Sequence, residues 1–302
     1  MLQPEVALHS KAAHTNALPR LVIYYQTHHD SSGKFISIRP LLQPGISVTH
    51  VILAAIHINE DPNSITLNDQ VLEHPRYQPL WPELRILQAS GVKVMGMLGG
   101  AAKGSFLRLD GSNEQFERYY APLRDLVHQR KLDGLDLDVE EEMSLQGMIR
   151  LIDRLRSDFG KDFIITLAPV AKAMLDPTKN LSGFDYMELE VVRGNEIAWY
   201  NTQFYCGWGD LSNTLMYELM VQKGWNPEKI VVGMVTNPKN ANGFVPLEML
   251  LPVLGTLKRQ NQRFGGIMGW EYFNSLPGDI HQPWEWARMM TIHLGRGDAP
   301  QQ

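Results

Sequence analysis

The sequence predicts an α/β protein of the TIM-barrel class, a single (β/α)₈ barrel with no inserted α+β domain. Three observations support this prediction. Short apolar runs alternate with longer amphipathic segments, eight such runs are present, and 302 residues suit one barrel as well as two smaller domains. A doubly wound sheet would carry a glycine-rich fingerprint after an early strand, and none of the early runs is followed by one.

The eight runs are rich in the β-branched and aromatic side chains that strands favour. They occupy residues 20–26, 48–58, 92–100, 132–139, 162–170, 199–207, 229–235 and 264–273. Strands that alternate with helices form a parallel sheet, and eight of them close most economically into a barrel.

Two segments between the runs, residues 113–131 and 144–160, have clear helical patterns. In the second segment, apolar residues recur every three or four positions, and Gly160 supplies a stop signal. The apolar face consists of Leu145, Met148, Ile149, Ile152 and Leu155. We expect the barrel to occupy residues 19–295, with a loose arm at 1–18 and a frayed tail at 296–302.

The composition argues against several classes of partner. The net charge is −5 and no basic stripe is present, which argues against nucleic acid. The sequence contains no stretch of about 20 apolar residues, which is the length that a membrane-spanning helix needs. Cys206 is the single cysteine, so no internal disulfide can form, and the N-terminal residues lack the apolar core of a signal peptide. We therefore expect a cytoplasmic protein, and we expect it to be a monomer.

One predicted strand carries a dense run of acids, in the segment KLDGLDLDVEEE at residues 131–142. Side chains alternate along a strand, so Asp136, Asp138 and Glu140 share one side and the intervening apolar residues share the other. In a barrel these acids line the interior, with Asp136 deepest and Glu140 at the C-terminal mouth, where barrel active sites lie. Stacked carboxylates repel one another, so at least one should be protonated near neutrality. A protonated acid beside a carboxylate can perform general acid catalysis on a sugar.

A solvated acidic turn and a metal site are the two alternatives to a catalytic role for these acids. A solvated acidic turn explains Glu141 and Glu142, but not the strict alternation of the other three acids with apolar residues. A magnesium or calcium site would use oxygen ligands, yet three in-line ligands from one strand wrap an ion poorly. We therefore expect no metal and no cofactor.

The segment DGLDLDVE, residues 133–140, fits the DxxDxDxE signature of the family 18 glycoside hydrolases, which include chitinases and endo-β-N-acetylglucosaminidases. Other segments resemble further strands of that family in the right order, and several resemble the filamentous-fungal endo-β-N-acetylglucosaminidases more narrowly. They include LVIYY, MGMLGG, TQFY, WYNTQFYCGWG and GGIMGWEYF. Met97 departs from the family pattern, in which a serine usually helps to hold the inner aspartates.

The resemblance implies a retaining, substrate-assisted mechanism. Glu140 would protonate the glycosidic oxygen, and the 2-acetamido oxygen of the substrate would attack the anomeric carbon to give an oxazolinium ion. Asp138 would orient the acetamido N–H, Asp136 would share a proton with Asp138, and Tyr205 would hold the acetamido oxygen. The expected substrate-binding residues are Gln203, Trp270 as a stacking platform, Tyr24, Gly99, Gly100 and Asn201.

The resemblance favours an enzyme that cleaves between the two core N-acetylglucosamines of high-mannose N-glycans, free or on a glycoprotein. A small chitinase and a non-catalytic lectin of the same fold are the alternatives. The lectin is disfavoured because the catalytic residues are all present. Short connections between the strands predict an open groove, which suits a branched glycan better than linear chitin. His57 is expected either to touch substrate or to be buried, and Cys206 to be a small buried side chain.

Overall fold

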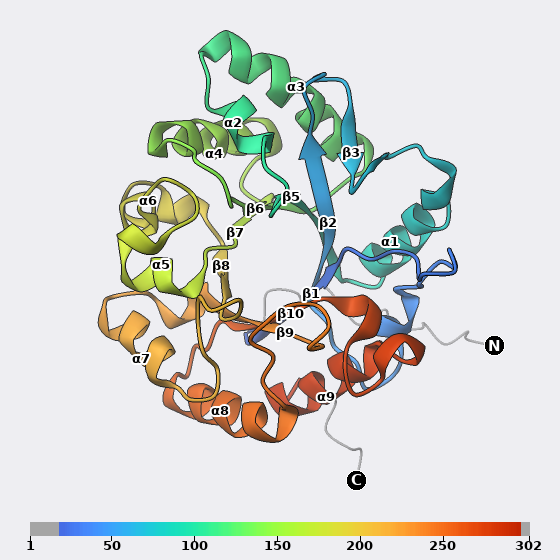
Figure 1. Cartoon of the computed structure of the whole chain (residues 1–302), viewed down its shortest axis with the longest axis vertical. Helices are drawn as coiled ribbons and strands as arrows, with labels where there is room; N and C mark the ends of the chain where they lie inside the picture. Colours follow the sequence, from blue (N-terminus) through green and yellow to red (C-terminus); the bar gives the residue numbers. More distant parts are fainter. Residues whose placement is uncertain (1–17, 297–302) are drawn as a thin grey trace, which may run out of the picture.

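In the computed structural model, which describes residues 18–296, eight parallel strands pair side by side in a closed barrel (Figure 1). The barrel strands are β1 (Arg20–Tyr25), β2 (His50–Ile58), β5 (Lys93–Gly99), β6 (Gly134–Asp138), β7 (Ile164–Leu167), β8 (Trp199–Gln203), β9 (Ile230–Val235) and β10 (Gly266–Trp270). β1 pairs with both β10 and β2, which closes the ring. Each strand lies within one predicted segment, so the predicted barrel is confirmed. The predicted arm and tail lie outside the described residues, except for Leu18 and Arg296.

α-Helices surround the barrel on its outside (Figure 1). They are α1 (Leu80–Ala89), α2 (Ser105–Leu109), α3 (Asn113–Gln129), α4 (Leu145–Phe159), α5 (Ala171–Leu175), α6 (Tyr186–Arg193), α7 (Leu215–Gln222), α8 (Leu247–Gln260) and α9 (Trp284–Leu294). The two predicted helices correspond to α3 and α4. Each begins at a serine cap, because Ser112 Oγ accepts the Gln115 N–H (3.2 Å) and Ser144 Oγ accepts the Gly147 N–H (3.0 Å). None of the helices in residues 18–296 is long and apolar enough to cross a membrane.

The connection between β1 and β2 departs from the regular strand–helix alternation. Residues 26–49, all of them described, contain the short 3₁₀ helix η2 (Arg39–Leu42) in place of an α-helix. Gln43 is extended after this turn because it precedes Pro44, and a residue before proline avoids the helical region. One of the seven connections between successive barrel strands therefore contains no α-helix.

A short antiparallel hairpin that the sequence did not predict extends the sheet beside β2. It consists of β3 (Ile65–Leu67) and β4 (Gln70–Val71), and it pairs with the C-terminal end of β2. Asn68, in its turn, donates to the Gln26 carbonyl (3.0 Å) and accepts the Ala55 N–H (3.1 Å). The hairpin is thus held against the ends of β1 and β2, and the connection after β2 is longer than the short loops that the sequence predicted.

The acidic strand β6 has the two faces that its alternation predicts. Leu135, Leu137 and Val139 belong to the large apolar core between the barrel and the helices. Asp136 and Asp138 point the other way, into the barrel interior, where Asp136 bonds to groups from three other strands. Burial of the apolar face fixes which side of the strand faces the interior.

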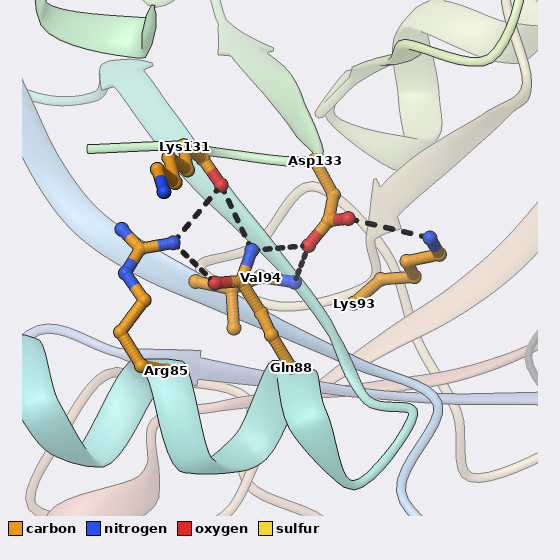
Figure 2. A network of polar contacts seen from close by, with 6 residues as sticks. All are labelled: Arg85, Gln88, Lys93, Val94, Lys131 and Asp133. Atoms are coloured by element: carbon orange, nitrogen blue, oxygen red, sulfur yellow. Dashed lines mark hydrogen bonds and ion pairs between the residues drawn. The ribbon is translucent and has the colours of Figure 1, made fainter. Parts of the chain in front are cut away.

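Asp133, the first acid of the signature, lies in a separate environment (Figure 2). It precedes β6 at the end of the barrel opposite the mouth, where its Oδ2 accepts the Val94 N–H (2.8 Å) and Gln88 Nε2 (2.7 Å). Its Oδ1 pairs with Lys93 Nζ at 3.3 Å, and Gln88 also donates to the Lys131 carbonyl (2.8 Å). Asp133 therefore ties β6 to β5 and to α1.

We predict that Asp133→Ala lowers the free energy of unfolding by about 1–3 kcal/mol, because it leaves the Val94 N–H without its acceptor. Asp133→Asn should lower it less, since the amide oxygen can still accept that bond. Urea unfolding followed by circular dichroism measures both changes. Asp125→Ala, on the exposed side of α3, is the control. A loss for Asp133→Ala no larger than that of the control would contradict a structural role for Asp133.

Candidate active site

A cavity of about 410 Å³ opens at the C-terminal mouth of the barrel. Strand ends from both sides of the ring contribute to its wall. The predicted site residues that line it are Tyr24, Gly99, Gly100, Asp138, Glu140, Gln203, Tyr205 and Trp270. A concave site of this size at this end of a barrel is typical of small-ligand binding and catalysis.

Asp136 and Asp138 of β6, with Glu140 two residues beyond the end of the strand, form a column that runs from the barrel interior into the cavity. Asp136 is fully buried, Asp138 is 6% exposed, and Glu140 is half-buried at the top of the column. This is the depth order that the alternation of the strand predicts. Only Asp138 and Glu140 line the cavity, so only they can meet a ligand there.

Three hydrogen-bond donors from three different strands hold Asp136. Tyr24 Oη donates to Oδ2 (2.6 Å), while Thr166 Oγ1 (2.6 Å) and Asn201 Nδ2 (2.9 Å) both donate to Oδ1. Burial raises the pKa of Asp136 above its ordinary value, and the three hydrogen bonds oppose that shift by stabilising the anion. The deepest acid is therefore fixed in place by the barrel.

Met97 lies beside Asp136 in the pairing of β5 with β6. Its buried thioether packs in the barrel interior and has no proton to donate. Thr166 lies beside Asp136 on the opposite neighbour, β7, and its hydroxyl supplies a bond to the carboxyl group. Sequence reasoning missed Thr166, although its position in the predicted fifth strand places it opposite an inner acid.

Asn201 lies deeper than the sequence suggested. It is fully buried, it does not line the cavity, and its amide donates to Asp136. Its Oδ1 accepts Trp199 Nε1 (2.9 Å), and Arg20 stacks over the Trp199 ring at 4.5 Å. In place of the expected sugar contact, Asn201 connects the acid column to the base of the barrel interior.

One amide group links the two upper acids. Gln203 Nε2 donates to Asp138 Oδ1 (3.1 Å), to Glu140 Oε1 (3.4 Å) and to the Ala168 carbonyl (2.9 Å). Burial, followed by the charges of Glu140 and Asp136, raises the pKa of Asp138 well above its ordinary value. Burial also raises the pKa of Glu140, an effect that Gln203 and the Lys103 charge oppose. The upper pair therefore retains a proton to a higher pH than an exposed carboxyl group.

Three aromatic side chains complete the cavity. Tyr205 is buried in its wall, and burial together with the charges of Asp138 and Glu140 raises the pKa of the phenol well above its usual value. The phenol therefore stays a neutral hydrogen-bond donor. Trp270 is half-buried across the barrel from Glu140, and Tyr24 meets its ring edge-on at 5.5 Å between centroids. The edge contact fixes the indole, whose face is suited to packing against a sugar ring.

Gly99 and Gly100 allow the end of β5 to approach β6 closely. Both have left-handed backbone angles, with φ of +94° and +85°. A Cβ on Gly99 would lie 2.4 Å from the Phe106 ring and 2.5 Å from the Asp138 carbonyl oxygen. The Gly100 N–H donates to that same carbonyl (2.8 Å), so these glycines help to position the backbone that carries Asp138.

Two sequence predictions near the site are wrong. Glu141 is not part of a solvated turn: it is 6% exposed, and its carboxylate accepts the backbone N–H groups of Gly104 (2.7 Å) and Phe106 (2.9 Å) at the start of α2. Cys206 is exposed at the cavity wall, because its φ of +55° ends the strand alternation on which its predicted burial depended. Glu142 is exposed, as predicted.

Several lining residues were not predicted as site residues, because they lie on loops without a distinctive sequence pattern. They are Gln26, Ala101, Ala102, Val170, Leu181, Trp208, Asn240 and Ala241. His57, for which the sequence left two possibilities open, also lines the cavity. In the part of the chain that the structure describes, no group of three or more histidine, cysteine, aspartate or glutamate side chains is arranged to hold a metal ion.

The chemistry that this cavity can perform follows from its acids. A half-buried carboxylic acid with a raised pKa can deliver a proton to a bound ligand, and a second acid lies next to it under the same amide. A neutral phenol and a tryptophan face can hold a polar group and an apolar ring face of the same ligand.

Comparison with known proteins points to one family. The family model described as "Glycosyl hydrolases family 18" matches residues 20–244. Among solved structures, a fungal endo-β-N-acetylglucosaminidase from glycosyl hydrolase family 18 is 48% identical, with a TM-score of 0.90 over 93% of this chain and 100% of that one. A chitinase, ChiC, from Aspergillus fumigatus is 56% identical, with a TM-score of 0.84 over 90% of this chain and 98% of that one.

More distant relatives include longer proteins. Chitinase 2 of Rhizopus oligosporus is 26% identical over 222 residues, which is 68% of this chain and 38% of that protein. Chitinase 1 of Rhizopus niveus is 25% identical over 211 residues, which is 63% of this chain and 39% of that protein. The chain thus spans less than half the length of these two relatives.

We predict that Asp138→Asn raises the stability of the protein at neutral pH. The pKa of Asp138 is raised on folding, so the native state binds more protons than the unfolded state above the ordinary carboxyl pKa of 3.8. The contribution of Asp138 to the free energy of unfolding therefore falls as pH rises from 3.8 toward the raised pKa of the folded state, by at most about 1.4 kcal/mol per pH unit. Asparagine resembles the protonated acid and avoids this loss.

Thermal unfolding between pH 4 and pH 8 provides the measurement. The stability difference between Asp138→Asn and the wild type should be small near pH 4 and should grow as pH rises. Asp125→Asn, at an exposed position of α3, should show no such growth. A stability difference that is independent of pH would show that folding does not raise the pKa of Asp138.

Proposed function

The chain belongs to family 18 of the glycosyl hydrolases, and we propose that it is an endo-β-N-acetylglucosaminidase that cleaves between the two core N-acetylglucosamines of high-mannose N-glycans. The observation that carries this proposal is the position of Asp138, Glu140 and Tyr205 around one cavity, with Trp270 facing them. The likeness to the fungal endo-β-N-acetylglucosaminidase supports the choice of glycan.

The proposed reaction uses the acetamido group of the substrate as its nucleophile. Glu140 protonates the glycosidic oxygen as the bond to the anomeric carbon breaks, and the acetamido oxygen closes an oxazolinium ring on that carbon. Asp138 accepts the acetamido N–H and stabilises the positive charge of the ring. Glu140, now ionised, then takes a proton from the water that opens the ring. The configuration at the anomeric carbon is retained.

The neighbouring side chains prepare the two acids for these steps. Gln203 bonds to both Asp138 and Glu140, so it holds their spacing while a proton moves. The neutral Tyr205 hydroxyl donates to the acetamido oxygen, which turns that oxygen toward the anomeric carbon. Trp270 packs against the ring of the reacting sugar.

The shape of the mouth favours a branched glycan. Only residues 100–104 separate β5 from α2, and residues 204–214 connect β8 to α7. The short loop after β5 builds a low wall there, so mannose branches can extend over that part of the rim while one N-acetylglucosamine occupies the cavity. The hairpin of β3 and β4 raises the rim beside β2.

A chitinase is the second candidate, and a specific observation favours it. The Aspergillus fumigatus chitinase ChiC is 56% identical to this chain, against 48% for the endo-β-N-acetylglucosaminidase. Chitin and the N-glycan core share the β-linked pair of N-acetylglucosamines, so the same acids serve both reactions. The two functions differ in what the rest of the cavity and its rim accept.

We predict that Glu140→Gln folds normally and loses about 10²–10⁴-fold or more in kcat, because an amide cannot donate the proton. Initial rates of glycan release from a high-mannose glycoprotein measure the loss, because the sugar leaving group there needs the proton. Glu142→Gln, two residues away and exposed, is the matched control and should retain wild-type activity. If Glu140→Gln kept most of the activity, Glu140 could not be the acid. A wild type that cleaved neither the glycoprotein nor chitin oligomers would indicate a lectin.

For the substrate, we predict that the protein releases the glycan from a high-mannose glycoprotein and leaves one N-acetylglucosamine on asparagine. Little or no product should arise from chitin oligomers, because the low wall after β5 leaves a line of several sugars unsupported on that side. Mass spectrometry of the protein and of the released sugars reads both reactions at equal enzyme concentration. Efficient cleavage of chitotetraose with an untouched glycoprotein would make the protein a chitinase.

A further inference from the structure

His57 is a cavity residue to which the proposed reaction assigns no role. It lies near the C-terminal end of β2, where it pairs with Thr66 of the hairpin, and its half-buried ring lines the cavity. β2 and β8 lie four strands apart in either direction around the eight-stranded ring. His57 therefore faces the cavity from the side opposite Tyr205 and Gln203.

The hydrogen-bond state of the ring indicates what it offers a ligand. Nδ1 is buried without a partner, and within residues 18–296 no protein group bonds to Nε2 either. Nε2 is not closed off in the same way, so it is the nitrogen that a ligand in the cavity can reach. Burial lowers the pKa of His57, with only partial opposition from Asp69, so the ring is neutral near pH 7 and carries one proton.

The position of that proton follows from the burial of Nδ1. An N–H group buried without an acceptor is rarer in proteins than a buried acceptor without a donor. The proton therefore belongs on Nε2, and His57 presents an N–H donor to the cavity. Oxygen atoms of sugar hydroxyls are suitable acceptors.

The part of the substrate that meets this donor follows from the geometry of the reacting sugar, and this step rests on the proposed function. The anomeric carbon lies at Glu140 on the β6 side, and the acetamido group on the adjacent carbon lies at Tyr205 on the β8 side. O4 is on the far side of the ring from both carbons. It therefore points toward the sector of β10, β1 and β2, where His57 and Gln26 line the cavity.

We propose that His57 is a specificity-determining residue, whose Nε2–H donates to a hydroxyl oxygen of the hexose attached to O4 of the reacting N-acetylglucosamine. The opposite wall, after β7 and β8, presents Val170, Leu181 and Trp208, which offer mainly apolar surface. The two sides of the cavity thus differ in chemistry. The side that faces the proposed hexose is the one on which His57 offers its N–H donor.

The test compares the binding of a monosaccharide with that of a disaccharide, so it does not depend on turnover. The ligands are N-acetylglucosamine, mannosyl-β-1,4-N-acetylglucosamine and di-N-acetylchitobiose, titrated against the full chain by NMR. His57→Phe keeps a planar ring and removes both nitrogens, and His57→Gln restores an N–H donor. His128→Phe makes the same change at an exposed position of α3 and serves as the control.

We expect His57→Phe to weaken binding of the mannosyl disaccharide about five- to tenfold and to leave N-acetylglucosamine binding unchanged, as loss of one hydrogen bond to the second sugar requires. His57→Gln should recover most of the loss, and His128→Phe should match the wild type. Equal weakening of monosaccharide and disaccharide would indicate a structural role and overturn the proposal. Unchanged affinity for the mannosyl disaccharide in His57→Phe would overturn it as well.

The chitobiose titration and the hydrolysis assays separate this inference from the proposed function. If His57→Phe weakened binding of di-N-acetylchitobiose but not of the mannosyl disaccharide, the proposed hydrogen bond from His57 to mannose would be overturned, whatever substrate is hydrolysed. A protein that releases N-glycans but shows no His57 effect would refute the role of His57 and leave the proposed function standing. A His57 effect on the mannosyl disaccharide in a protein that fails to cleave N-glycans would refute the proposed function alone.

Discussion

Two carboxylic acids on β6 and a third, Glu140, just beyond its end project from one face into a closed barrel and its mouth, and the rest of the site depends on this constraint. Moving an ionised carboxylate out of water is unfavourable by several kcal/mol unless hydrogen bonds replace the lost hydration. Three acids at alternate positions also repel one another. The interior can hold them only by supplying donors, by keeping protons on some of them, or by opening toward water, and β6 uses each of these at a different depth.

The donors come from strands far apart in the sequence, so the site exists only when the barrel is closed. Tyr24 on β1, Thr166 on β7 and Asn201 on β8 meet at the Asp136 carboxyl group. Met97 occupies the remaining neighbouring position as an apolar spacer. Thr166, on the other side of Asp136, supplies a hydroxyl hydrogen bond, so the column keeps a fixed base beside an apolar neighbour.

The same constraint separates catalytic chemistry from substrate choice. In the proposed reaction the acid column, Gln203 and Tyr205 act on the β-linked N-acetylglucosamine itself, and these residues are held by strands and strand ends. The groups that could distinguish one neighbouring sugar from another lie at strand ends and on loops, such as His57 and Trp208. A protein of this fold can therefore change its substrate without disturbing the buried acids, which is consistent with similarity to both an endo-β-N-acetylglucosaminidase and a chitinase.

Periodicity was enough to predict the eight barrel strands, the helices α3 and α4, and the depth order of the three acids, because alternation of side chains is a local property of a strand. The hairpin of β3 and β4, the non-helical connection after β1 and the exposure of Cys206 were not predictable in this way. They depend on proline, on left-handed backbone angles and on contacts between distant segments. Glu141 shows the difference most clearly: its sequence neighbours suggest a solvated turn, but tertiary packing brings the start of α2 to its carboxylate. Local pattern thus identified the acids and their strand, whereas closure of the barrel determined which groups stabilise them and which residues surround the ligand.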